Sequence, residues 1–200
     1  MTDAALIERF LNGDINAFNT LIWRWEKPLY NFILRTIGNR EHAKDLCQMV
    51  FIRMYKQLKT LKDPEKFSSW VYRIALNLCK DEFKKKRTRR TVSLDALTSE
   101  DSDQNTVKHQ FQDRSIGSPE ELMQNRQVES IIKNALKKIP DEQRVVIVMK
   151  QYQGLKFTEI ADILNEPINT VKSRLYYGLR AMRKVLEESN FSKEVLLHEM

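Results

Sequence analysis

Side chains that can bind nucleic acid recur along a short stretch near the C-terminus. Within residues 169–180, amide, hydroxyl and cationic side chains return at steps of three or four, which places them on one side of a helix. Such groups donate to phosphates and to the edges of bases. The predicted contacts are Asn169, Thr170, Lys172, Ser173, Arg174, Tyr176, Tyr177 and Arg180.

A helix-turn-helix would position these residues. Its first helix is expected to begin at Thr158, whose hydroxyl could cap free amides, and Pro167 favours the start of a second helix. The predicted buried stripe of that second helix comprises Val171, Leu175, Leu179, Met182 and Leu186. A helix-turn-helix can place its second helix in the major groove of DNA. The alternative is an ordinary helical hairpin with a solvated polar face.

A second stretch, residues 67–90, combines aromatic rings with cations. Its first part reads FSSWVYRIALN, and its last part, KKKRTRR, has six basic residues in seven. Rings that stack on unpaired bases contribute about 1–3 kcal/mol per base, while cations hold the backbone. This composition predicts binding of single-stranded DNA. The alternative is that Phe67 and Trp70 are core residues and that the basic run is a solvated helix end.

The charge of the chain is unevenly distributed. Its net charge of +7 divides into +9 over residues 1–90, −5 over residues 91–125 and +3 over residues 126–200. The acidic middle is rich in Ser, Thr, Asp, Asn and Gln, so it cannot bury enough apolar surface to offset its ordering entropy. We therefore predict an all-α protein with two small helical domains, 1–90 and 126–190, joined by a flexible acidic linker, 91–125, and followed by a tail, 191–200.

Apolar periodicity predicts the helices of the first domain. We expect them at residues 4–12, 16–25, 28–37, 41–58 and 67–87, with Pro28 opening the third and Gly38 and Asn39 ending it. Cys47 and Cys79 fall within these apolar patterns and form no closely spaced pair. Both are therefore predicted to be buried free thiols.

The sequence lacks several kinds of site. No run approaches the roughly 20 apolar residues that span a bilayer, and the N-terminus lacks a signal peptide pattern. There is no metal-ligand spacing, phosphate-binding glycine loop or nucleophile motif. We therefore expect a cytoplasmic protein that inserts in no membrane, holds no metal or cofactor and is not an enzyme.

Two patterns in order make the chain resemble a known family. EHAKDLCQMVFIRMYKQL and FSSWVYRIALNLCKDEFKKKR are similar to the second region of bacterial RNA polymerase sigma factors of the sigma-70 family, extracytoplasmic-function (ECF) group. IPDEQRVVIVMKQYQGLKFTEIADILNEPINTVKSRLYYGLRAMR is similar to their fourth region. The resemblance covers most of residues 10–187. It implies a factor that binds core polymerase and directs initiation at specific promoters.

The resemblance also implies roles for individual residues. The −35 element would be read by the C-terminal helix-turn-helix. The −10 element would be melted and read by Lys62, Phe67, Trp70, Arg73, Asn77 and Lys80. The clamp helices of the largest polymerase subunit would be bound by Asp45, Leu46, Gln48, Met49 and Phe51. Further implied partners are the flap of the second-largest subunit and, as is common in the family, an anti-sigma factor.

Three positions depart from the family pattern. Met49 stands where an acidic residue is usual, Asn169 where glycine is frequent and Tyr177 where arginine is common. Two alternatives belong to other classes of protein. A stand-alone helix-turn-helix regulator would explain residues 157–184 but leave residues 67–90 unused. A nuclease would need clustered carboxylates for metal ions, and none converge in this sequence.

Overall fold

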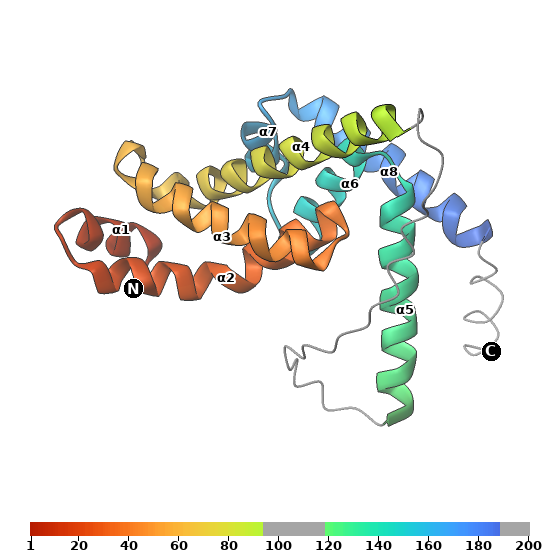
Figure 1. Cartoon of the computed structure of the whole chain (residues 1–200), viewed down its shortest axis with the longest axis horizontal. Coiled ribbons are helices and arrows are strands. Elements are labelled where there is room, and N and C mark those ends of the chain that lie inside the picture. Colours follow the sequence, from red (N-terminus) through yellow and green to blue (C-terminus); the bar gives the residue numbers. More distant parts are fainter. Residues whose placement is uncertain (94–118, 189–200) are drawn as a thin grey trace.

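A computed structural model describes residues 1–93 and 119–188, with side chains described for 1–88 and 127–188. Every long element in these ranges is a helix and none is a strand, which confirms the all-α prediction (Figure 1). The α-helices are α1 (Asp3–Leu11), α2 (Ile15–Ile37), α3 (Arg40–Gln57), α4 (Phe67–Ser93), α5 (Pro119–Lys138), α6 (Asp141–Ile147), α7 (Phe157–Leu164) and α8 (Ile168–Glu188). Two short 3-10 turns, η1 (Leu58–Thr60) and η2 (Pro64–Lys66), separate α3 from α4, and a π-helical turn, η3 (Val148–Tyr152), follows α6.

Local signals account for where the first helices begin and end. The side chain of Thr2 accepts a bond from the amide of Ala5, and that of Asp14 accepts one from Asn16. Gly38 ends α2 in the left-handed conformation, with φ of 75°, and Asn39 caps α3 by accepting from the amide of His42. The predicted stop at Gly38 and Asn39 is therefore confirmed.

The predicted break at Pro28 is wrong. Residues 15–37 form one continuous helix with Pro28 inside it. Proline removes one amide donor from the helix, but Leu21, Leu29 and Phe32 lie on the same fully buried face. Burial on both sides of Pro28 therefore favours continuation, which the sequence pattern alone did not reveal.

One continuous apolar core joins the two halves of the chain. It contains Leu21, Phe32 and Val50 from the N-terminal module (α1–α4) and Val146 and Ile160 from the C-terminal module (α5–α8). In Figure 1, α2, α3 and α4 run alongside one another, α7 packs against α4, and α5 stands across their end.

Polar bonds reinforce the contact between the two modules. The hydroxyl of Tyr72 donates to Oε1 of Gln153 over 2.7 Å, and the guanidinium of Arg73 donates to the main-chain oxygen of Asp162 over 2.5 Å.

The expected linker, 91–125, has helix at both ends, because α4 runs to Ser93 and α5 begins at Pro119. The rest of it, 94–118, and the expected tail, 191–200, lie outside the described residues.

Candidate nucleic-acid interface

The predicted helix-turn-helix consists of α7 and α8. The first helix begins one residue earlier than expected, at Phe157, and its cap is not the hydroxyl of Thr158. Instead, the carboxylate of Glu159 accepts from the amide of Lys156 over 2.6 Å. Asn165 ends α7 in the left-handed conformation, with φ of 56°, and α8 starts directly after Pro167.

The buried side of α8 differs from the predicted stripe at one position. Val171 is fully buried and Leu175 half-buried, as expected, but Leu179 is 43% exposed. Gly178 is the buried residue in that turn, because α6 approaches α8 there. A Cβ on Gly178 would lie 2.8 Å from Cδ1 of Ile147 and 3.1 Å from Cβ of Gln143. The prediction for Leu179 is therefore wrong, and a glycine permits the contact.

Most predicted DNA contacts on α8 face solvent. Exposed positions include Asn169, Lys172, Ser173, Tyr176, Tyr177 and Arg180, while Thr170 is half-buried. Tyr176 and Tyr177 are 64% and 55% exposed, with their ring centroids 5.5 Å apart. The hydroxyl of Ser173 donates to the main-chain oxygen of Asn169. Together they form an outward surface with amide, hydroxyl, phenol and cationic donors, as a major-groove helix requires.

Arg174 differs from its neighbours because its guanidinium is already engaged. One nitrogen pairs with Glu166 over 2.8 Å and another with Glu142 over 3.0 Å. Its side chain is 22% exposed. Arg174 thus ties α8 to α6 and to the turn after α7, a role that the sequence pattern did not reveal.

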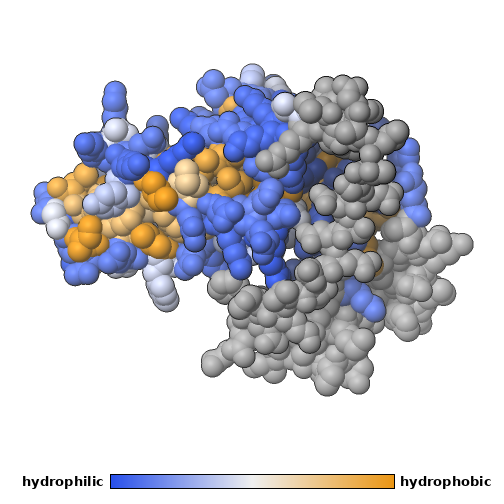
Figure 2. Space-filling model, in the orientation of Figure 1, coloured by the Kyte–Doolittle hydropathy of each residue, from blue (hydrophilic) through white to orange (hydrophobic). Residues whose placement is uncertain are grey.

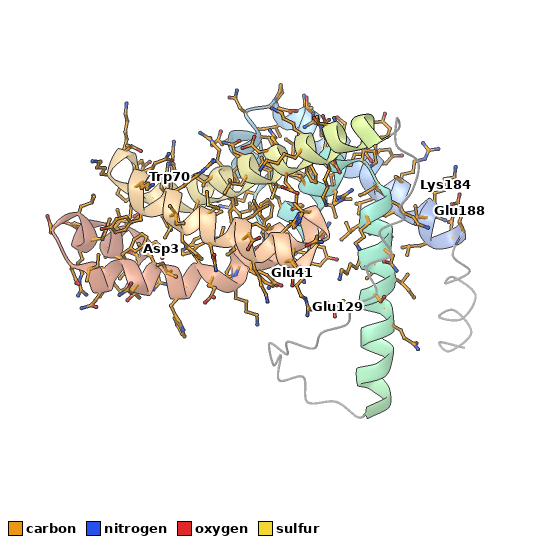
Figure 3. The ribbon with its side chains drawn as sticks, in the orientation of Figure 1. Asp3, Glu41, Trp70, Glu129, Lys184 and Glu188 are labelled. Atoms are coloured by element: carbon orange, nitrogen blue, oxygen red, sulfur yellow. The ribbon has the colours of Figure 1, made fainter. Side chains whose placement is uncertain are left out.

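The aromatic residues of α4 divide into core and surface. Phe67 is 1% exposed and packs edge-on against Trp25, with ring centroids 5.5 Å apart. It has no face available for a base, so its predicted DNA contact is corrected to a core role. Trp70 is half-buried, with its centroid 5.9 Å from that of Phe67, and lies near the start of α4 (Figure 3).

The polar residues of the same track remain outside. Lys62, Asn77 and Lys80 are exposed, and so is Arg73, although its guanidinium is bonded to the C-terminal module. Further along α4, Lys80, Lys84 and Arg87 line a cavity of about 240 Å³ opposite Asp141, Glu142 and Glu166. In this arrangement the basic track of α4 faces carboxylates of the C-terminal module.

The residues predicted to bind polymerase lie on α3. Asp45, Gln48 and Met49 are exposed, and Leu46 and Phe51 are half-buried. Gln48 and Phe51 also line a hollow of about 330 Å³ shared with Ile22 and Tyr30 of α2.

The N-terminal module also exposes apolar residues on α1, α2 and α3. Leu11, Ile15, Ile52 and Tyr55 are each about half exposed. Figure 2 shows hydrophobic surface over this end of the N-terminal module. Contiguous exposed apolar surface is typical of a protein-binding face.

Both cysteines are buried free thiols, as predicted. Burial raises the pKa of Cys47 to about 12 and raises that of Cys79 further, and nearby Glu26 and Glu82 act in the same direction. Burial likewise raises the pKa of the Tyr72 hydroxyl. These groups are therefore protonated near neutral pH. The two thiols serve packing, and the Tyr72 hydroxyl keeps the proton that it donates to Gln153.

Arg144 is a structural residue that the sequence reasoning missed. It is 7% exposed and bonds to the main-chain oxygens of Leu136, Thr36 and Ile139 over 2.7, 2.8 and 3.0 Å. Burial lowers its pKa, and the carboxylate of Asp141, 3.0 Å away, opposes that shift. No local pattern distinguishes it from a surface arginine on an amphipathic helix.

The described residues contain neither a membrane-spanning helix nor a metal-binding cluster. None of the helices in residues 1–93 and 119–188 combines the length and the apolar character that a membrane crossing needs. Among the side chains of residues 1–88 and 127–188, no three from His, Cys, Asp or Glu gather closely enough to hold a metal ion.

The chain matches two family descriptions in order. Sigma-70 region 2 matches residues 21–89, and Sigma-70, region 4 matches residues 129–182.

Curated relatives match over nearly their whole length. The RNA polymerase sigma-H factor of Pseudomonas aeruginosa is 30% identical over 185 residues, covering 92% of this chain and 94% of the relative. The ECF RNA polymerase sigma factor SigW of Bacillus subtilis is 33% identical over 182 residues, covering 91% and 95%. The ECF RNA polymerase sigma-E factor of Escherichia coli is 29% identical over 183 residues, covering 91% and 93%.

Solved structures share the fold. The sigma factor RpoE in complex with the anti-sigma factor NepR, from Bartonella quintana, aligns with a TM-score of 0.64 at 18% identity, over 85% of this chain and 96% of that one. CnrH, in complex with the cytosolic domain of CnrY, aligns with a TM-score of 0.64 at 20% identity, over 93% and 97%.

Proposed function

Because the chain belongs to the ECF group of the sigma-70 family, we propose that it directs RNA polymerase to promoters by contacting their −35 and −10 elements. As a sigma factor it acts in transcription initiation. The observation that carries the proposed promoter contacts is the polar face that α8 exposes to solvent, while the apolar face of the same helix is buried.

The −35 element is assigned to α8. Its exposed donors suit phosphates and base edges in the major groove. Lys172 and Arg180 contribute charge, and Asn169 and Ser173 contribute hydrogen bonds. Arg174 is assigned a supporting role, because Glu142 and Glu166 already engage its guanidinium.

The −10 element is assigned to the exposed side of α4 and the loop before it. Asn77 and Lys80 face solvent one helical turn apart, and Trp70 offers part of its ring. An amide can bond the edge of an extruded base, while a cation holds the neighbouring phosphate. Phe67 supports Trp70 from within the core and is no longer assigned a base contact.

The core polymerase is assigned to α3. Asp45, Gln48 and Met49 form its exposed polar and apolar edge, and Phe51 adjoins the hollow between α2 and α3. The expected partner of this face is the clamp of the largest subunit, and the flap of the second-largest subunit is expected to bind the C-terminal module. The exposed apolar residues Ile52 and Tyr55 extend the surface available for such contacts.

An anti-sigma factor is a further proposed partner. The RpoE and CnrH structures that share this fold are complexes with NepR and with the cytosolic domain of CnrY. The apolar end of the N-terminal module gives such a partner a surface to cover (Figure 2).

Promoter binding requires the two modules to rearrange. Arg73 is bonded to Asp162, and the basic track of α4 faces Asp141, Glu142 and Glu166. These carboxylates would repel a phosphate backbone, so we expect the modules to separate when polymerase core is bound. When one polymerase core holds the two modules apart, they could bind two DNA elements at the same time.

In vitro transcription on a promoter library tests this function. With core polymerase added, the protein should select templates that share two spaced motifs. A shift of promoter DNA by the protein alone, as tight as with core, would instead favour a stand-alone regulator. Cleavage of the DNA after addition of magnesium would favour a nuclease. Asn77→Ala should spare duplex binding but impair strand opening, and equal loss of both would contradict its assignment.

A further inference from the structure

A second cavity, of about 440 Å³, lies between the two modules on a different surface. The end of α2 and the start of α3 line one wall, and α5 with Tyr152 of η3 lines the other. None of its residues is among the predicted DNA or polymerase contacts. The volume falls within the range of about 300–1,000 Å³ that is typical of small-molecule sites.

The lining of this cavity is short of negative charge. Four cations, Arg35, Arg40, Lys133 and Lys137, line it together with a single carboxylate, Glu129. Within residues 1–88 and 127–188, no ion pair joins Arg35, Lys133 or Lys137 to a carboxylate. The pKa of Lys133 is lowered by burial first and then by the charges of Lys137 and Arg40, and Glu129 only partly opposes this. The cations around Lys133 thus outnumber the one carboxylate that lines the cavity with them.

One of these cations, Lys137, packs closely against the backbone at Gly38. Gly38 has φ of 75°, and a Cβ there would lie 3.0 Å from Cε of Lys137. The aliphatic stem of Lys137 therefore packs over the turn between α2 and α3. Its ammonium group is brought to the cavity from the opposite module, beside Arg35 and Arg40.

The remaining walls suit a ligand with a flat apolar part. The guanidinium of Arg35 lies 4.4 Å from the centroid of the Tyr152 ring, which is 39% exposed. Leu34 and Leu136 contribute apolar surface. A guanidinium presents a planar pair of donors that matches phosphate oxygens, and an aromatic ring can stack on a base.

We propose that this cavity binds a small phosphorylated anion of the nucleotide class. Its phosphates would lie among Arg35, Arg40, Lys133 and Lys137, with the ring of Tyr152 beside a base where one is present. Because the cations come from both modules, a bound anion would stabilise the packed arrangement of the modules over any separated one.

Isothermal titration of the full-length protein tests this proposal, with pyrophosphate and ATP as probes. We expect saturable binding of both. Lys137→Met keeps the aliphatic stem and removes the charge, and it should weaken binding at least about tenfold, as should Lys133→Glu. The control is Lys184→Glu, on α8, whose side chain is 79% exposed (Figure 3). It makes the same charge change as Lys133→Glu and should alter affinity less than about twofold.

Tyr152→Leu tests whether the ligand is a nucleotide or a phosphate compound that lacks a base. Weaker binding of ATP alone would identify a nucleotide as the ligand, and unchanged binding of both probes would identify phosphate groups as the whole determinant. Three results would overturn the proposal. The first is the absence of saturable binding, and the second is an equal loss of affinity in Lys184→Glu and Lys133→Glu. The third is binding that appears only after Glu100, Asp101 and Asp103 are neutralised, since the chain's own acidic segment would then be the occupant.

Discussion

The guanidinium of Arg144 donates to the main-chain oxygen of Thr36 over 2.8 Å, across 108 positions of sequence. Thr36 lies in the last turn of α2, where main-chain oxygens lack partners within the helix. The same guanidinium satisfies the oxygens of Leu136 and Ile139 at the end of α5. One buried cation therefore completes the ends of two helices and joins the two modules.

Arg144→Met should destabilise the protein strongly. Methionine keeps much of the volume but leaves several buried oxygens without donors, so we expect the free energy of unfolding to fall by at least about 3 kcal/mol. Urea denaturation followed by circular dichroism measures this. The matched control is Arg183→Met, which removes an exposed i,i+4 pair with Glu187 and should cost less than about 1 kcal/mol. Similar losses in the two variants would contradict the role of Arg144.

Local sequence signals predicted much of this fold. Asn39 and Gly38 mark a helix boundary through chemistry that depends only on neighbouring residues, and the break before Pro167 is of the same kind. Both buried thiols also follow from apolar periodicity. These features can be predicted from the sequence because they depend on residues that lie only a few positions apart in the chain.

The remaining features depend on packing between distant segments. Continuation of α2 through Pro28, burial of Phe67 and the contact of Gly178 with Ile147 each require a partner from another helix. The same holds for Arg174, which resembles its exposed neighbours in sequence but pairs with two carboxylates in the structure. Periodicity places a residue on a face, but it does not say which face another helix will cover.

Gly178→Val should weaken the packing of α8 on α6. Valine has a higher helix propensity than glycine by only a few tenths of a kcal/mol, whereas forcing side chains into a packed contact costs about 1–3 kcal/mol. Cβ of Gln143 and Cδ1 of Ile147 would both have to move. We therefore expect a net loss of at least about 1 kcal/mol in thermal or urea unfolding. Leu179→Val, at the neighbouring exposed position, is the control and should change stability little.

Stability should decline at alkaline pH because of the cysteines. The pKa of Cys47 is about 12 in the folded state against 9.0 ordinarily, so the folded protein retains a proton that the unfolded chain releases. The stabilisation is fully present below pH 9 and is lost as pH rises toward 12, at up to about 1.4 kcal/mol per pH unit for one such group.

Urea unfolding of wild type and Cys47→Ala between pH 8 and pH 11 checks this expectation. The variant loses packing at every pH, but its stability should fall less steeply above pH 9 because one titrating thiol is gone. Parallel slopes in the two proteins would show that Cys47 does not contribute to the alkaline loss. A thiol reagent should likewise modify the native protein far more slowly than the protein in urea.

Lys172 and Arg174 should respond differently to replacement by alanine. Lys172 is exposed on the proposed −35 face, whereas Arg174 is 22% exposed and joined to Glu142 and Glu166. Lys172→Ala should therefore weaken −35 binding by the polymerase complex without changing thermal stability. It should also reduce the slope of log affinity against log salt by about 1, as loss of one phosphate contact predicts.

Arg174→Ala should act through the fold of the helix-turn-helix. Removing the guanidinium takes away the one group that pairs with both Glu142 and Glu166, so thermal stability should fall along with −35 affinity. Arg174→Lys would keep the charge but lose the geometry that reaches both carboxylates, and should recover only part of the stability. Polymerase binding through α3 should be unaffected in Lys172→Ala. An unchanged melting temperature in Arg174→Ala, with affinity lost as in Lys172→Ala, would instead assign Arg174 to DNA contact.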